Sequence, residues 1–106
     1  MAYDISYMPI ASEQLRALPT RDQRTVVDSV EEQLRHEPEV ETRNRKRMRP
    51  NNLATWELRV GDLRVFYEIE PPAPAGEEPV LPTVVILAVG LKKGNRLWIG
   101  DEEVEL

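Results

Sequence analysis

The sequence predicts an α+β fold: an N-terminal strand and a helical hairpin, followed by a mainly antiparallel twisted sheet of three to four strands. Three observations predict this fold. Apolar and polar residues alternate over residues 2–7, apolar residues then recur at helical spacing, and two further alternating runs flank a Gly-Asp pair. Helices grouped before hairpin-linked strands are typical of the α+β class. At 106 residues, we expect one domain over 1–106 with one core.

The first helical segment follows Pro9, which ends the N-terminal strand. Ser12 is the expected helix cap, and Ala11, Leu15 and Leu18 share one helix face. Pro19 marks the end of this short helix.

The second helix is expected from about Arg21 to His36, before Pro38. Thr20 and Gln23 have the spacing of a capping box at its start. Its apolar face is made of four residues at helical spacing: Val26, Val27, Val30 and Leu34. With only two residues between them, the two helices should form a helical hairpin.

The central hairpin follows from the Gly61-Asp62 pair, a strong turn signal between the runs 56–60 and 63–67. A two-residue loop pairs Trp56 with Tyr67, Leu58 with Val65 and Val60 with Leu63, which gives one wholly apolar face for the core. The other face pairs Arg59 with Arg64 and Glu57 with Phe66. Directly opposed arginines repel each other. They indicate either a phosphate-binding surface or two solvated side chains.

The remaining segments are two strands and four polar stretches. Residues 83–89 are apolar after Thr83, which predicts a central strand covered on both faces and ended by Gly90. The basic run 43–49 is expected in a solvated loop or at a binding surface, and the Pro-rich residues 71–79 in an exposed connector. A basic turn at 91–96 precedes a short strand at 97–99 and an acidic tail at 101–106.

The charge distribution is uneven. The net charge is -5, yet residues 43–67 carry seven basic and two acidic residues. In an acidic protein with one basic band, bulk electrostatics would not drive nonspecific nucleic-acid binding strongly, but a local site could bind nucleic acid. No apolar run approaches a membrane span, no signal peptide is evident, and cysteine is absent, so we expect a cytoplasmic protein without membrane association.

Metal and nucleophile chemistry find little support in the sequence. The single His36 sits at a helix C-terminus without a ligand set, and no cysteine or second histidine is present to support nucleophilic catalysis. Guanidinium and ammonium groups, which match phosphate chemistry, are what remain. The candidate RNA-binding residues are the basic run and two aromatic residues that could stack on bases: Arg43, Arg45, Lys46, Arg47, Arg49, Phe66 and Trp98. For Trp98, a core or interface position is an equal alternative.

Two segments resemble the RelE/ParE superfamily of type II toxins. Residues 58–67 are similar to that family's R-x-G-x-x-R-hydrophobic-x-Y hairpin, and residues 85–93 to its apolar strand that ends in Gly and basic residues. The order of elements also matches over nearly the whole chain. The resemblance implies a RelE-like fold and a toxin that acts as a ribosome-dependent mRNA endoribonuclease and thereby inhibits translation.

The resemblance also implies roles for individual residues. Arg64 would hold the scissile phosphate, with further basic positions at Arg59, Lys92, Lys93 and Arg96. Glu57 stands where some members have lysine, and would act as a general base or neutralise Arg59. Trp98 stands where the family often has tyrosine. Attack by a 2′-OH builds negative charge that preplaced cations stabilise, so this route needs no metal or other cofactor.

Partners and alternatives follow from the same resemblance. We expect a cognate antitoxin, the ribosome and mRNA as partners, with a homodimer or a heterotetramer with antitoxin as possible assemblies. A ParE-like DNA gyrase inhibitor and a catalytically inactive RelE-like protein-binding module are the alternatives. The acidic residues 101–103 could also reach the basic band, or remain solvated.

Overall fold

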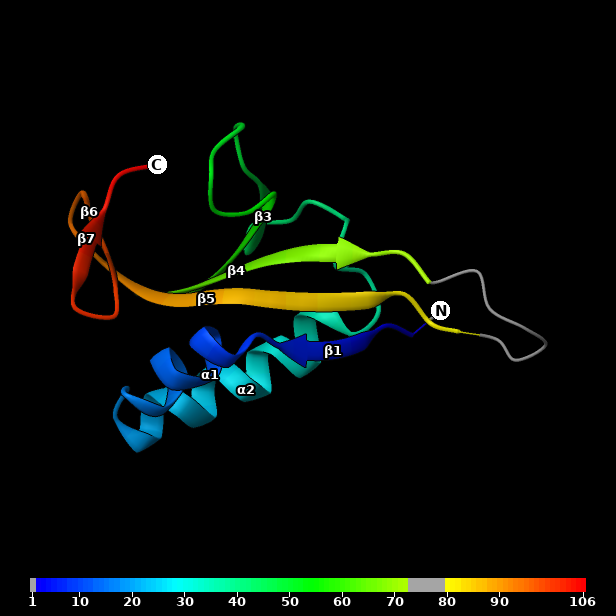
Figure 1. Ribbon diagram of the computed structural model, residues 1–106, viewed down its shortest axis with the longest axis horizontal. Helices are drawn as coiled ribbons and strands as arrows, with labels where there is room; N and C mark the ends of the chain where they lie inside the picture. The colour runs from blue at the N-terminus through cyan, green and yellow to red at the C-terminus, as the bar shows by residue number, and fades with distance from the viewer. Residues whose placement is uncertain (1, 73–79) are drawn as a thin grey trace.

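The computed structural model describes residues 2–72 and 80–106. Within them, two helices lie against one face of a seven-stranded sheet (Figure 1). The predicted connector at 71–79 lies mostly outside the described residues. The helices are α1 (Pro9–Arg16) and α2 (Thr20–Leu34), and neither has the length and apolar character needed to cross a membrane. The strands are β1 (Asp4–Tyr7), β2 (Arg45–Arg47), β3 (Trp56–Val60), β4 (Leu63–Glu70), β5 (Thr83–Lys93), β6 (Arg96–Ile99) and β7 (Glu102–Val104).

The sheet has the order β2-β3-β4-β5-β6-β7, and all of these neighbours are antiparallel. Strand β1 pairs in parallel with the first half of β5. The α+β class and the mainly antiparallel sheet are confirmed. The number of strands is higher than expected, because part of the basic run forms β2 and part of the acidic tail forms β7.

The register of the β3–β4 hairpin is confirmed at all five predicted pairs, including Arg59 with Arg64 and Glu57 with Phe66. Gly61 has a φ of 58°, the left-handed conformation that a two-residue turn requires. The predicted apolar face packs against the helices. The core between the sheet and the helices contains Ala11, Val26, Val30, Leu34, Trp56, Leu58, Leu63, Val65, Tyr67, Val84, Ile86 and Val89.

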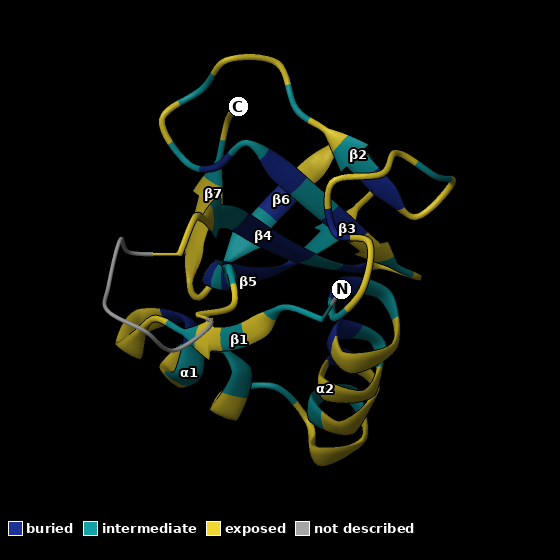
Figure 2. Cartoon of the chain, turned by 90° about the vertical axis from the view of Figure 1, so that its right-hand side faces the viewer, coloured by how far each residue is buried: buried dark blue, intermediate teal, exposed yellow. Residues whose placement is uncertain are grey.

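A second apolar cluster covers the opposite face of the sheet. Its buried members are Ala54, Phe66, Ala88 and Leu97, and partly buried side chains from the 48–53 segment, β5, β6 and β7 pack against them. Strand β5 is therefore covered on both faces, as its continuous apolar sequence predicts. In Figure 2 the loops and strands of this second side rise above the sheet, away from α1 and α2.

Both predicted helix caps are wrong. Helix α1 begins at Pro9, one turn before Ser12, because proline needs no N–H partner at the first helical position. Helix α2 begins at Thr20 and ends at Leu34, not at 21 and 36. Gln23 does not close a capping box, since its side chain donates hydrogen bonds to the carbonyl oxygens of Leu18 and Arg16 at 2.8 and 3.2 Å.

Gly90 does not end its strand, which continues to Lys93. A Cβ at Gly90 would lie 2.6 Å from the Trp98 carbonyl oxygen and 3.0 Å from Ile99 Cγ1. The glycine therefore permits close approach of β6 to β5. The β5–β6 hairpin in turn positions β7 and the C-terminal residues beside the second cluster.

Candidate nucleic-acid interface

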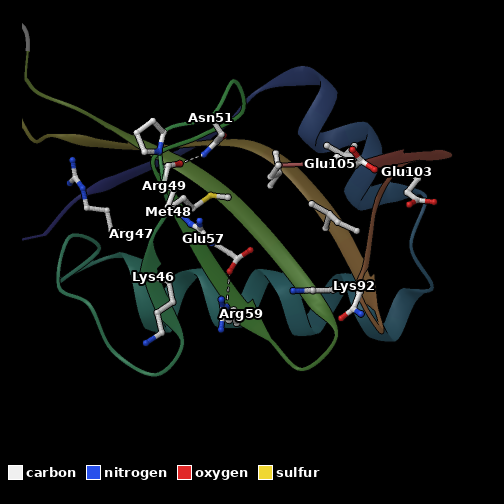
Figure 3. A pocket seen from close by; sticks show the side chains of 15 residues that line it. Lys46, Arg47, Met48, Arg49, Asn51, Glu57, Arg59, Lys92, Glu103 and Glu105 are labelled. Atoms are coloured by element: carbon white, nitrogen blue, oxygen red, sulfur yellow. Dashed lines mark hydrogen bonds and ion pairs between the residues drawn. The ribbon is translucent and has the colours of Figure 1, made fainter.

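A groove of about 800 Å³ lies on the face of the sheet opposite the helices (Figure 3). Its walls come from both ends of the sheet: β2, the following loop and β3 on one side, and β5–β7 on the other. The second apolar cluster lies between these walls and contributes Leu97, Val104 and Met48 to the groove. Segments that are far apart in the sequence thus line one groove, whose floor is formed by the second apolar cluster.

Basic side chains dominate the β2–β3 wall. Lys46 pairs across the strands with Glu57, so both lie on the groove face of the sheet, and Arg49 and Arg59 also line the groove. Arg47 borders the groove, but its guanidinium carbon is 5.8 Å from the centre of the Trp56 ring, on the helix side of the sheet. Lys92 extends from β5 on the other wall, toward Glu57 and Arg59 in Figure 3.

The Glu57 carboxylate occupies the middle of this basic wall. Its Oε1 accepts a hydrogen bond from Arg59 Nε at 2.7 Å, and its side chain is only 12% exposed whereas that of Arg59 is 46% exposed. The carboxylate is thus held in place while the guanidinium keeps an open face toward solvent. A fixed carboxylate among cations is a suitable arrangement for accepting a proton next to a bound phosphate.

The opposite wall contains acidic residues from the C-terminal segment. Glu103, Glu105 and Leu106 line the groove with Lys92, and Figure 1 shows the C-terminal end turning toward the β2–β3 loop. Glu103 Oε1 lies 4.0 Å from Arg96 Nη1, an exposed ion pair at the edge. Glu103 therefore pairs with the basic turn and not with the basic run 43–49, while Asp101 and Glu102 are exposed and do not line the groove.

The loop after β2 is held by Asn51, a residue that the sequence interpretation missed. Its Nδ2 donates to the carbonyl oxygens of Arg49 and Ala54, and its Oδ1 accepts from the backbone N–H groups of Leu53 and Ala54, at 2.7 to 3.0 Å. Glu68 of β4 accepts a further hydrogen bond from the Thr55 N–H. The Pro50-Asn51-Asn52 sequence is a turn signal that indicates such a role.

Arg64, the residue expected to hold the scissile phosphate, does not line the groove. Its Nη1 donates to the carbonyl oxygens of Gly61 at 2.6 Å and Leu63 at 2.9 Å, which holds the guanidinium at the hairpin turn. Its Nε is buried without a hydrogen-bond partner among the described residues. The paired Arg59 has the more open guanidinium of the two.

Two predicted RNA-binding residues are structural. Phe66 is fully buried in the second apolar cluster, where no base can stack on it. Arg45 is 8% exposed, and its guanidinium donates hydrogen bonds to the carbonyl oxygens of Val40 and Gln33 at 2.9 and 2.7 Å. The alternation of β2 explains this, because Arg45 shares its face with the buried Leu58.

Four other predicted residues also lie outside the groove. Trp98 pairs with Leu91, which packs against the helix-side core, so its side chain projects to the face of the sheet opposite the groove. Lys93 and Arg96 pair with each other on that same side, and exposed Arg43 precedes β2. The basic turn is thus divided by strand alternation, and only Lys92 faces the groove.

Neither a tyrosine nor a histidine lines the groove, and the described residues include no group of three His, Cys, Asp or Glu side chains placed to hold a metal ion. The chemically useful groups of the groove are therefore one fixed carboxylate and several cations. Together they can bind a phosphodiester and accept a proton from a neighbouring hydroxyl.

Comparison with known proteins finds similarity among solved structures. No protein-family model and no curated protein matches the chain. Among solved structures, the chain is similar to a chain of the toxin–antitoxin complex RelBE2 from Mycobacterium tuberculosis, with 29% sequence identity and a TM-score of 0.65. The match covers 87% of this chain and 100% of that chain. The RelE-like resemblance and the RelE-like fold are confirmed.

Proposed function

We propose that this RelE-like protein is the toxin component of a type II toxin–antitoxin pair and cleaves mRNA on the ribosome. The observation that carries the proposal is the Glu57–Arg59 pair, with Lys92 directed toward it from the facing wall of one groove. The similarity to a chain of a toxin–antitoxin complex supports the toxin assignment. The proposed cleavage mechanism is therefore argued from the residues of the groove and not from this similarity.

The basic wall provides binding. Lys46, Arg49 and Arg59 follow one side of the groove. Guanidinium groups bind phosphate oxygens through paired hydrogen bonds and lysines add positive charge. A single strand laid along this wall places its phosphates against cations and its bases over the apolar groove residues.

Cleavage needs a base, charge stabilisation and an acid. The Glu57 carboxylate removes the proton from a ribose 2′-OH, whose oxygen then forms a bond to the adjacent phosphorus. Arg59 stabilises the negative charge that develops on the phosphate oxygens. The Lys92 ammonium donates a proton to the departing 5′-oxygen as the P–O5′ bond breaks. The products are a 2′,3′-cyclic phosphate and a 5′-hydroxyl.

The partners of this activity are mRNA, the ribosome and an antitoxin. The antitoxin would cover the basic groove or displace its cations, and a segment with acidic side chains is suited to the Lys46–Arg59 wall. Binding of this kind would prevent RNA from entering the groove.

The test is expression in bacterial cells with mapping of mRNA ends and of DNA breaks. We expect growth arrest with mRNA cleaved at ribosome-bound positions, and loss of both effects in Arg59→Ala. Arg43→Ala, an exposed arginine outside the groove, is the matched control and should arrest growth normally. Arrest with intact mRNA and broken DNA would instead support a ParE-like gyrase inhibitor. Absence of arrest, with no antitoxin present, would support an inactive protein-binding module.

A further inference from the structure

A second hollow of about 520 Å³ adjoins the groove on the other side of the loop after β2. It shares five consecutive lining residues with the groove, from Arg47 to Asn51. Its remaining lining residues come from the loop, β4 and β5: Asn52, Leu53, Ala54, Thr55, Glu68 and Leu87. One rigid loop therefore separates two adjoining hollows.

We infer that the second hollow is a subsite for a neighbouring nucleotide of the same single strand that occupies the groove. This inference rests on the proposed function. The strand would cross the Arg47–Asn51 loop, with a phosphate contacted at the crossing by the exposed Arg49. The base next to that phosphate would enter the second hollow.

The lining of the second hollow suits a nucleotide base. Met48, Leu53 and Leu87 are partly buried apolar side chains that leave some surface open to the flat face of a base. Asn52 is exposed, and its amide can both donate to and accept from a base edge. A base has this same combination of an apolar face and polar edges.

The one carboxylate of the second hollow already has a structural role. Glu68 Oε1 accepts the Thr55 N–H, which anchors the end of the loop to β4. The four hydrogen bonds of Asn51 hold the rest of the loop. Because these contacts are made within the chain itself, the strand would bind a preformed crossing point and lose less conformational entropy on binding.

The test measures the affinity of the full chain for single-stranded RNA oligonucleotides lengthened one nucleotide at a time, by fluorescence anisotropy. Asn52→Glu places a negative charge in the second hollow, and Asn95→Glu, at an exposed turn position, places the same charge at the first groove. We expect Asn52→Glu to weaken the affinity for long oligonucleotides about two- to fivefold. The affinity for the shortest oligonucleotide that binds should be unchanged. Asn95→Glu should weaken binding at every length.

A variant of opposite sign completes the experiment. Asn52→Lys should strengthen binding of long oligonucleotides only. Equal effects of the Asn52 variants at all lengths, or no effect at any length while Asn95→Glu weakens binding, would overturn the second subsite and leave the proposed function in place. If Arg59→Ala and Asn95→Glu also leave the affinity unchanged, the proposed nucleic-acid groove is itself wrong.

Discussion

Glu57 and Arg59 lie two residues apart on β3, and the carboxylate of the first accepts a hydrogen bond from the guanidinium of the second at 2.7 Å. Alternate residues of a strand project to the same face, so the pair is directed into the groove. Glu57 is mostly covered, while nearly half of the Arg59 side chain remains exposed. The pair therefore combines a fixed carboxylate with an accessible cation.

Glu57→Gln separates catalysis from binding at this pair. Glutamine keeps the shape of the side chain but cannot accept a proton as a base, so the rate of mRNA cleavage should fall about a hundredfold or more. RNA affinity should be retained or slightly increased, because a negative charge is removed from the basic wall. Cleavage rates and anisotropy with short RNA measure the two effects. Unchanged cleavage would show that Glu57 only neutralises Arg59.

Glu105→Gln tests the acidic wall of the groove. Removal of this charge should raise RNA affinity about twofold at low salt, and the gain should shrink as salt screens the field. Glu32→Gln, an exposed position on α2 across the sheet, is the matched control. An equal gain in both variants would mean that net charge alone is responsible.

Arg45→Ala should destabilise the fold by about 2 to 3 kcal/mol, since it removes the buried guanidinium that donates to the carbonyl oxygens of Val40 and Gln33. Arg43→Ala, also in the basic run but exposed, should change the free energy of unfolding by about 0.5 kcal/mol or less. Urea denaturation measures both. Equal stabilities would contradict a structural role for Arg45.

Gly90→Ala should cost about 1 to 3 kcal/mol of stability, because the added Cβ would meet the Trp98 backbone oxygen at 2.6 Å. The β5–β6 pairing would have to move, and with it the wall that carries Lys92 and Glu105. Thermal unfolding reports the loss. Gly94→Ala is not an equivalent control, because Gly94 has a positive φ of 61°, which would strain alanine for a different reason. Ala88→Gly removes a methyl group on the same face of β5 and provides a comparison without a clash.

Stability should fall in alkaline solution because of Tyr7. Burial raises the pKa of Tyr7 to about 12, with a further contribution from the charge of Glu31, whereas tyrosine in an unfolded chain ionises near pH ~10. Above that pH the unfolded chain loses the proton first, so the free energy of unfolding decreases as pH rises toward the folded pKa. Burial also raises the pKa of Tyr67, so this residue contributes to the same loss of stability at high pH.

Urea denaturation at a series of pH values, with the wild type and Tyr7→Phe, checks this dependence. The Tyr7 hydroxyl is buried and has no hydrogen-bond partner among the described residues, so the substitution removes the titration without the loss of a hydrogen bond. The variant should lose less stability than the wild type above pH ~10. Parallel curves for the two proteins would contradict the assignment to Tyr7.

Much of the fold was predictable because its signals are local. The Gly61-Asp62 turn and strict alternation on either side gave the correct register of β3 and β4. The helical spacing of Val26, Val30 and Leu34 correctly predicted the buried face of α2, although Val27 is exposed. Helix starts were less accurate, because the backbone and the prolines, and not the side-chain caps, determine where α1 and α2 begin.

The candidate site was predicted less well than the fold. The sequence identified the types of residue and the β3–β4 face that carries Glu57 and Arg59. It did not show which members of the basic run and the basic turn share that face, since β2 was not recognised as a strand. Alternation in β2 and β5 then separates Lys46 from Arg45, and Lys92 from Lys93.

The α+β class, the central hairpin and the basic band within an acidic chain follow from local sequence patterns, because turn chemistry, periodicity and charge are properties of neighbouring residues. The tertiary structure decided which cations form the groove and that the acidic C-terminal segment forms its opposite wall. Those relations join β2 and β3 to β5–β7 across the second apolar cluster. Contacts between segments so distant in sequence depend on strand order and packing, which no local pattern contains.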